Sequence, residues 1–470
     1  MQRSLLTVCV VFGLAAPAFA ATPLEQKKIQ QLEARIKALE ANAASMQKQT
    51  ADALAALRAT RAEVEQIKAS QQTAATIAQP ASAAVAGASS PFDPASVAAA
   101  PPTVEPNGAN GNAFNPAMSI ILNGAYAHNS LNPDHYVRAG FPLAGAAGPV
   151  PQGLSIAESE VSLAANIDEK FYGQLTLTAS NNKGQDHIGV EEAFIDTTSL
   201  PNGFSLRAGR FFSDIGYLNS HHTHTDKFYD RPLAYQAFLG AQYGDDGAQL
   251  RWVAPTSLFL ELGGEAFAGN NFPSGGGGHQ GVGVYTLFAH TGGDIGSDAS
   301  WLGGASMLKS QTVRAEDGFS GDNKLYIADG TLKWAPQGNF KDGGVTLRGE
   351  YFVDDRNGQY TAPVVPMPDP SAFDQPWNGQ RRGAYLEGVY RINRSWEAGY
   401  RYDRLWADRT GPHASPFDPS RNSVMLAWLN SEFSLVRLQY SRDQPNSFNI
   451  DNVLTLQYQV SLGAHGAHKF

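Results

Sequence analysis

The sequence predicts an all-β transmembrane barrel of about 16 antiparallel strands, preceded by an α-helical coiled coil. From about Ala117 to Phe470, sixteen segments alternate apolar and polar residues. Short and long connections alternate between these segments, and most tryptophans lie next to the short ones. A strand that faces lipid on one side and water on the other requires this alternation, as in bacterial outer-membrane barrels.

Residues 1–20 are typical of a secretory signal peptide, with Arg3, an apolar stretch over 5–16 and small residues before the expected cleavage site. Cys9, the single cysteine, lies in this segment, so the exported chain is expected to have neither a disulfide nor a zinc–thiolate site. The formal net charge is −9 and no basic tract is present, so nucleic-acid binding is not expected. No run of about 18 apolar residues follows the signal, which leaves a barrel as the expected membrane structure.

Residues 24–69 keep a heptad pattern over about six repeats, which favours a parallel coiled coil and self-association. A single amphipathic helix lying on a surface is the alternative. Small and polar core residues such as Ala43 and Thr50 leave dimer and trimer undecided. Residues 70–113 are rich in Ala and Pro with few large apolar side chains, which predicts a disordered linker before the barrel at 114–470.

The sixteen strands are expected at 117–129, 154–168, 171–182, 187–199, 204–213, 246–254, 258–269, 281–294, 298–312, 324–335, 344–354, 381–392, 396–407, 421–430, 434–443 and 452–470. The long loops are expected at 130–153, 214–245, 270–280, 313–323, 355–380 and 408–420. Tryptophan prefers the lipid headgroup level, and five tryptophans adjoin the short turns: Trp252, Trp301, Trp334, Trp396 and Trp428. We expect Trp406 in the outer girdle and Trp377 in an outer loop.

A sixteen-strand barrel is too wide for side chains alone to fill, so we expect a water-filled lumen and passage by diffusion. Strand parity turns charges of both signs inward: Arg207, Arg251, Arg348, Arg391, Arg401 and Arg437, with Glu158, Glu160, Glu261, Glu265, Glu350, Glu387, Glu397 and Asp403. The arginines could form a wall that steers anions. Equally, they could pair with the neighbouring acids and keep the lumen polar.

The loop over 214–245 is the candidate constriction, because it is long and too rich in apolar and aromatic residues to lie comfortably in water. Covering a subunit interface or a neighbouring loop is the alternative. The loop residues expected to line the pore are Asp214, Tyr217, Asp226, Asp230, Arg231 and Tyr235. The same loop holds the densest set of potential metal ligands in the chain: His221, His222, His224 and Asp226. Solvated histidines or a pH-dependent gate are the alternatives to a metal site.

The chain has no motif that groups a nucleophile, a base and an acid, so neither an enzyme nor a cofactor is expected. The architecture resembles trimeric porins with a periplasmic coiled coil, the DcaP-like porins, and more distantly the phosphate-selective porins. The stretches that carry the resemblance are 206–212 (LRAGRFF), 230–233 (DRPL) and 245–250 (DDGAQL), together with the barrel start at 114–122. The resemblance implies a homotrimer whose third loop narrows each pore, and small anionic solutes such as dicarboxylates. A dense basic ladder of the phosphate-specific kind is absent from the sequence.

The leading prediction is therefore an outer-membrane porin in the lipid bilayer, with its N-terminal region in the periplasm, for small hydrophilic solutes. Candidate pore contacts are Arg207, Arg251, Arg348, Arg401, Arg437, Glu261 and Glu350. Two alternatives are kept. One is a structural tether that binds peptidoglycan or a periplasmic partner through residues 24–69, and the other is a metal-uptake channel that uses the His-rich loop.

Overall fold

The computed structural model describes residues 116–182, 185–276, 281–312, 315–361, 374–411 and 413–463. The predicted signal peptide, coiled coil and linker lie outside the described residues, as does the terminal Phe470. The described strands are β1 (Ala117–Asn129), β2 (Gly153–Ile156), β3 (Ser159–Asn166), β4 (Phe171–Asn182), β5 (Gln185–Thr197), β6 (Phe204–Phe212), β7 (Gly244–Val253), β8 (Phe259–Phe267), β9 (Val284–Ile295), β10 (Ala299–Thr312), β11 (Phe319–Trp334), β12 (Gly344–Thr361), β13 (Asp374–Asn393), β14 (Trp396–Trp406), β15 (Ser420–Ser431), β16 (Ser434–Gln444) and β17 (Asp451–Gly463).

One short α-helix, α2 (Leu233–Leu239), and five 3-10 turns accompany the strands in the described part of the chain: η2 (Pro133–His135), η3 (Pro201–Gly203), η4 (Thr223–Thr225), η5 (Pro336–Gly338) and η6 (Phe340–Asp342). None of the described helices has the length and apolar character needed to span a bilayer.

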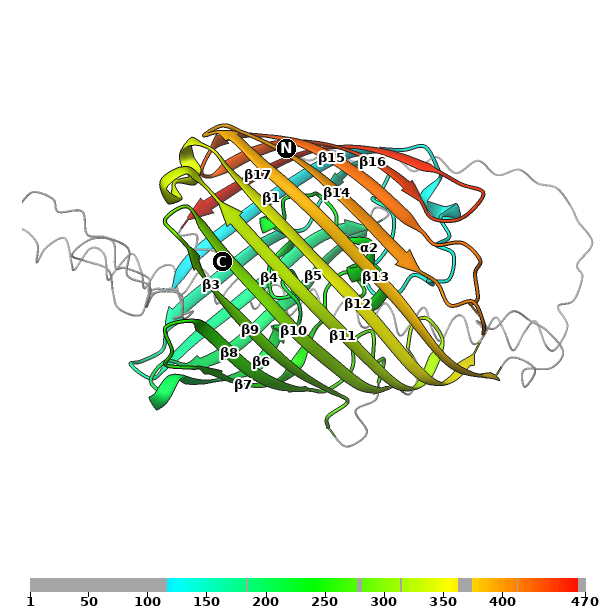
Figure 1. The fold of residues 1–470 in the computed structure, drawn as a ribbon, viewed down its shortest axis with the longest axis horizontal. Coiled ribbons are helices and arrows are strands. Elements are labelled where there is room, and N and C mark those ends of the chain that lie inside the picture. The colour runs from blue at the N-terminus through cyan, green and yellow to red at the C-terminus, as the bar shows by residue number, and fades with distance from the viewer. Residues whose placement is uncertain are drawn as a thin grey trace, which may run out of the picture. The chain divides into compact units, whose positions relative to one another are not determined.

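The strands form one closed antiparallel barrel, because the first strand pairs with the last (Figure 1). Ser119 of β1 lies opposite Gly463 of β17, and Asn129 lies opposite Val453. The short strands β2 and β3 both pair with β1, β2 along its second half and β3 along its first, so together they occupy one position. The seventeen described strands thus fill sixteen positions around the barrel, which confirms the predicted barrel.

Side chains alternate between the outside and the lumen as the sequence predicts. In β17, Leu454, Leu456 and Tyr458 are exposed, whereas Thr455 and Gln457 are buried. The exposed side chains are apolar and the buried ones are polar, the reverse of a soluble protein. This arrangement is stable only where lipid surrounds the barrel and the interior is polar.

Two predicted outer loops are wrong in their bounds, because much of each is strand. β11 begins at Phe319, inside the predicted loop 313–323, and the β12 and β13 hairpin extends far into the predicted loop 355–380. This part of the hairpin is polar on both faces, for example at Asp355, Arg356 and Asn357. A strand that extends beyond the bilayer has no lipid-facing side, so the alternation that identifies strands in the sequence is lost.

The tryptophans lie where the sequence predicts along the strands, except for one. Five tryptophans lie near the strand ends that the short turns connect: Trp252, Trp301, Trp334, Trp396 and Trp428. Trp377, predicted in a loop, lies instead within β13 and is buried. Its ring packs edge-on against Phe319 with a centroid separation of 5.8 Å, and its Nε1 donates to Asp408.

Candidate functional site

The segment between β6 and β7, residues 213–243, lies inside the barrel (Figure 1). Every residue of its helix α2 is buried. Tyr217, Leu218 and Phe228 of the same segment are buried as well. The apolar side chains that the sequence analysis singled out are thus covered by the inner wall and by one another. We call residues 213–243 the inward loop.

The helix α2 packs against the wall opposite β3–β6, where it contacts β12, β13 and β14. The ring of Phe238 lies 6.0 Å from that of Phe352 in β12, and the ring of Tyr235 lies 5.1 Å from it. Gly240 ends the helix in the left-handed conformation, with φ +62°. A glycine suits this position because a Cβ there would lie 3.1 Å from the Cα of Gly145.

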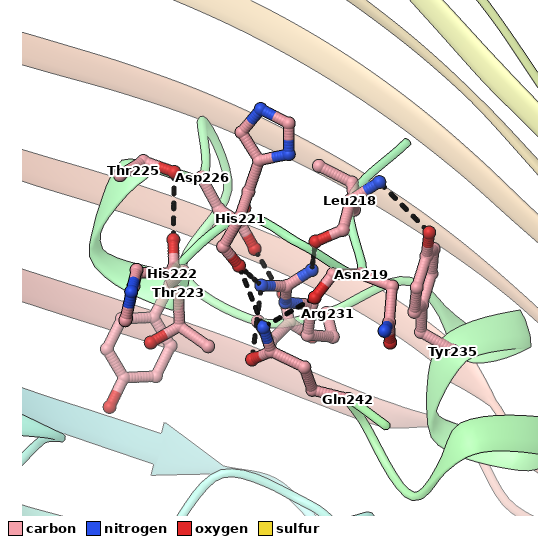
Figure 2. Close-up of polar contacts among 12 residues, drawn as sticks. Leu218, Asn219, His221, His222, Thr223, Thr225, Asp226, Arg231, Tyr235 and Gln242 are labelled. Carbon is pink, nitrogen blue, oxygen red and sulfur yellow. Dashed lines mark hydrogen bonds and ion pairs between the residues drawn. The ribbon is translucent and has the colours of Figure 1, made fainter. Parts of the chain in front are cut away.

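Arg231 organises the inward loop from within (Figure 2). Its guanidinium donates to the carbonyl oxygens of Leu218 and His221, and its Nε lies 2.9 Å from Oδ2 of Asp226. Arg231 is only 5% exposed, so the contacts replace its hydration. The predicted constriction residues Arg231 and Asp226 therefore hold the loop in shape.

Glu350 on β12 anchors the start of the loop. Its carboxylate accepts from the backbone amides of Tyr217 and Leu218 at 3.0 and 3.2 Å, and from the hydroxyls of Tyr235 and Tyr385 at distances from 2.6 to 3.0 Å. Because these donors satisfy a fully enclosed carboxylate, Glu350, predicted as a pore contact, joins the loop to the wall.

A second anchor is an ion-pair network around Asp230. Its carboxylate contacts Arg401 of β14 at 3.1 Å and also Arg421 of β15, and both arginines reach Asp403. Asp403 in turn accepts from the amide of Leu233, the first residue of α2, at 2.9 Å. Burial disfavours the charged form of Asp230, but Arg421 and Arg401 outweigh it and lower the pKa of its carboxyl.

A third anchor involves the predicted residue Asp214. Its backbone amide donates to Glu265 of β8 at 3.0 Å, and its carboxylate accepts from Gln249 of β7 at 2.8 Å. Lys227 reaches Glu397 of β14 at 2.9 Å. The inward loop is therefore attached to opposite sides of the barrel, and it spans the lumen.

The predicted lumen arginines face inward, and each has a partner. Their partners are acids, a hydroxyl, an amide or a carbonyl: Asp196 for Arg207 at 2.7 Å, both Ser205 and Glu261 for Arg251 at 3.1 and 3.3 Å, Glu387 for Arg348 at 3.0 Å, and both Gln457 and the Asp226 carbonyl for Arg437, at 2.7 and 2.6 Å. Arg348 also lies over the ring of Tyr217, 4.1 Å from its centroid. For Arg207, Arg251 and Arg348, this geometry agrees with the alternative in which the arginines pair with nearby acids.

The structure separates the four predicted metal ligands. His221 stacks on Tyr217 with a centroid separation of 4.6 Å, and Asp226 pairs with Arg231. His222 and His224 instead face glutamates of the barrel wall. A metal site made of the loop residues alone is therefore not assembled.

A second loop, residues 130–152, also folds inward, which the sequence pattern does not predict. Arg138 donates to Gln236 of α2 at 2.7 Å, and Phe141 packs edge-on against Phe238 at 5.8 Å. Tyr136 donates to Asp443 of β16 at 2.8 Å. The one available signal was the length of this loop, because it has two aromatic residues, Tyr136 and Phe141, against six in the inward loop.

No family model matches the chain. An uncharacterized protein of Aquifex aeolicus (strain VF5) is 30% identical over 353 residues, which cover 68% of this chain and 70% of that protein. A match of this extent and identity is that of two members of one family.

Solved structures similar in shape include a loop L8 deletion mutant of OmpT, an outer membrane protein of Vibrio cholerae, with a TM-score of 0.47 and 11% identity over 75% of this chain and 100% of that one. The outer membrane channel DcaP of Acinetobacter baumannii gives a TM-score of 0.46 and 11% identity over 74% and 97%. OmpF of Salmonella typhi in complex with daunomycin gives 0.47 and 10% over 75% and 99%. At these values the matches say nothing about solute or assembly.

Proposed function

We propose that this chain, which belongs to the same protein family as the uncharacterized protein of Aquifex aeolicus, is an outer-membrane channel for passive diffusion of small hydrophilic solutes. The observation that carries the proposal is the inward loop, which spans the polar lumen of a closed sixteen-strand barrel. Such a lumen is too wide for wall side chains to fill, and an inward loop leaves narrower aqueous paths beside it. Passive passage needs no cofactor and no catalytic group.

The solute preference is a second part of the proposal. Resemblance to the DcaP-like porins favours small anions, dicarboxylates among them. The ion pairs of Arg207, Arg251 and Arg348 neutralise much of the positive charge, so we expect the preference for anions to be modest.

Purified full-length protein in a planar bilayer is expected to give stepwise currents. In a salt gradient, the reversal potential is expected to show a slight preference for anions over cations. Dicarboxylates should reduce the current more than neutral sugars of similar size. Folded protein that inserts into the bilayer without giving any current would contradict the proposed channel function and favour a structural tether. A clear preference for cations would contradict only the anion part.

The barrel is also proposed to form a homotrimer, as its resemblance to trimeric porins suggests. The wall made of β3–β6 supports self-association, because its outer face has a shallow groove lined by small residues, including Ala165, Gly173, Ala193 and Ala208. The strands on this side have 8 to 13 residues, against 18 in β12 and 20 in β13 on the opposite side. Small side chains let two backbones approach closely within a membrane.

Native mass spectrometry in detergent is expected to give a trimer for the wild-type chain. Ala193→Trp is expected to shift the population to monomers, because the larger ring fills the groove. Ala384→Trp, at a partly exposed position of β13, is the matched control and should leave the trimer intact. A monomeric wild-type chain, or equal effects of the two substitutions, would contradict this interface.

A further inference from the structure

Six side chains with metal-binding or acidic groups meet where the inward loop touches the wall at β3 and β5. The loop contributes two histidines and the wall contributes four glutamates: His222, His224, Glu158, Glu160, Glu191 and Glu192. We call these six residues the His/Glu cluster. None of the anchors described above uses it.

Two irregularities of the wall bring the glutamates together. The break between β2 and β3 precedes Glu160 and places Glu158 where its carboxylate accepts from the hydroxyl of Thr223 at 2.8 Å. In β5, Thr176 pairs with Glu192 and Leu177 with Val190, so Glu191 is the extra residue of a β-bulge. The bulge turns two consecutive glutamates toward the loop, whereas a regular strand would direct one of them into lipid.

The potential ligand atoms converge. Nδ1 of His222 lies 3.2 Å from Oε2 of Glu160 and 3.3 Å from Oε2 of Glu191. Nδ1 of His224 lies 2.8 Å from Oε1 of Glu160. Bonds of about 2.0–2.1 Å to a tetrahedral ion place neighbouring ligand atoms about 3.3–3.4 Å apart, so small adjustments would admit an ion.

The second ring nitrogen of His222 has the partner that a metal ligand requires. Nε2 lies 3.0 Å from Oε2 of Glu192, which is the carboxylate–histidine arrangement that orients metal-binding imidazoles. When Nε2 carries the proton, Nδ1 presents a lone pair to Glu160 and Glu191. The same nitrogen forms ion-pair contacts with both oxygens when the ring is protonated, and neither contact has hydrogen-bond geometry. A lone pair that faces two carboxylates calls for a cation between them.

The charge of the cluster also favours a bound cation. In the part of the chain that the structure describes, the ion-pair partners of Glu160, Glu191 and Glu192 are histidines alone. The side chain of Glu160 is 1% exposed and those of Glu191 and Glu192 are 9% and 8% exposed, and none of the three forms an ion pair with a described lysine or arginine. Buried carboxylates without such partners are costly unless a bound cation balances them.

We propose that the His/Glu cluster binds one divalent transition-metal ion of the zinc type, through ligands supplied by the loop and the wall: His222, His224 and Glu160, with Glu191 as the candidate fourth. Imidazole ligands favour such an ion over calcium or magnesium, which select oxygen. The bound ion holds the inward loop to β3 and β5, on the side opposite the contacts of α2. The side chain of His222 is 19% exposed, so an ion can reach the cluster from solvent at this residue.

The test uses full-length protein without an affinity tag, treated with EDTA, dialysed, and then titrated with zinc in detergent. Wild-type protein is expected to bind zinc at a site that His222→Ala or Glu160→Gln weakens at least a hundredfold. Glu192→Gln keeps the shape of the side chain that contacts Nε2 of His222, and it is expected to weaken zinc binding by about 10–100-fold. His221→Ala is the matched control from the same loop and should bind as tightly as the wild type.

Cobalt supplies a readout that does not depend on channel activity. Cobalt bound to the wild type is expected to show the strong visible absorption of a four-coordinate ion, which His222→Ala should lose and His221→Ala should keep. Circular dichroism and the shift in gel migration between unheated and heated samples establish that each variant is folded. Zinc affinity that is equal in wild type, His222→Ala and Glu192→Gln, or the lack of zinc binding by folded wild type, would overturn the proposal. Silent bilayers with intact zinc binding would contradict only the channel.

Discussion

Replacing residues 214–242 with a Gly/Ser turn of about four residues is expected to raise the single-channel conductance several-fold. The inward loop spans the lumen, with an anchor to Glu265 of β8 on one side and anchors to Glu350, Arg401 and Arg421 of β12, β14 and β15 on the other. Removing it leaves the width of a sixteen-strand barrel open to water. The short turn can close the gap because Phe212 and Gly244 already face each other across β6 and β7.

The matched control replaces residues 447–449, in the connection between β16 and β17, with Gly and Ser, and it keeps Pro445 and Asn446, which hydrogen-bond to the loop 130–152. This connection lies at the long-loop rim, so the replacement should leave the conductance close to that of the wild type. Both variants are checked for a folded barrel by circular dichroism and gel migration. Unchanged conductance in a folded barrel without the inward loop would show that this loop does not limit the current.

Asp230→Ala is expected to lower the free energy of unfolding by about 3–5 kcal/mol, the range for removing one partner from a buried ion pair. The substitution leaves Arg401 and Arg421 with Asp403 as their only remaining acid among their described ion pairs. Water cannot solvate the two arginines in place of the lost carboxylate, because Arg401 is 1% exposed and Arg421 is 5% exposed. Unfolding in urea, followed by tryptophan fluorescence, measures the change.

Asp246→Ala is the control for this second prediction. Asp246 forms an ion pair of similar length with Arg210, at 2.7 Å, but the two side chains are 54% and 40% exposed. An exposed pair contributes about 0–1 kcal/mol, so the control should have little effect. Equal losses in both variants would contradict a specific contribution of the buried network. A loosened inward loop in Asp230→Ala should also make the channel current noisier.

Much of the barrel can be predicted from the sequence, because the alternation of apolar and polar residues along each strand reflects lipid on one face and water on the other. The bounds predicted for the first strand, 117–129, agree with those of β1, and 171–182 agree with β4. Outward Leu454 and Leu456 alternate with inward Thr455 and Gln457 as predicted. The prediction fails where lipid no longer contacts the strand, as in the outer part of the β12 and β13 hairpin.

The candidate site could be predicted less completely. The length and apolar content of the inward loop distinguish it in the sequence, because a water-exposed loop would not carry Phe228, Tyr235 and Phe238. Its contacts depend on positions far along the chain. Glu350 meets the amide of Tyr217 across a separation of 133 residues, a contact that no local pattern specifies.

The sequence by itself determined the barrel, the end of it at which five tryptophans gather and the identity of the loop that enters it, since these follow from which residues meet lipid, water or neither. Only the tertiary structure decided which charges are neutralised and which ligands converge. Arg207 could have faced a solute, yet it pairs with Asp196 because of the register of β5 and β6. Glu191 faces His222 because of a bulge of one residue, and strand register and bulges are set by pairing between strands.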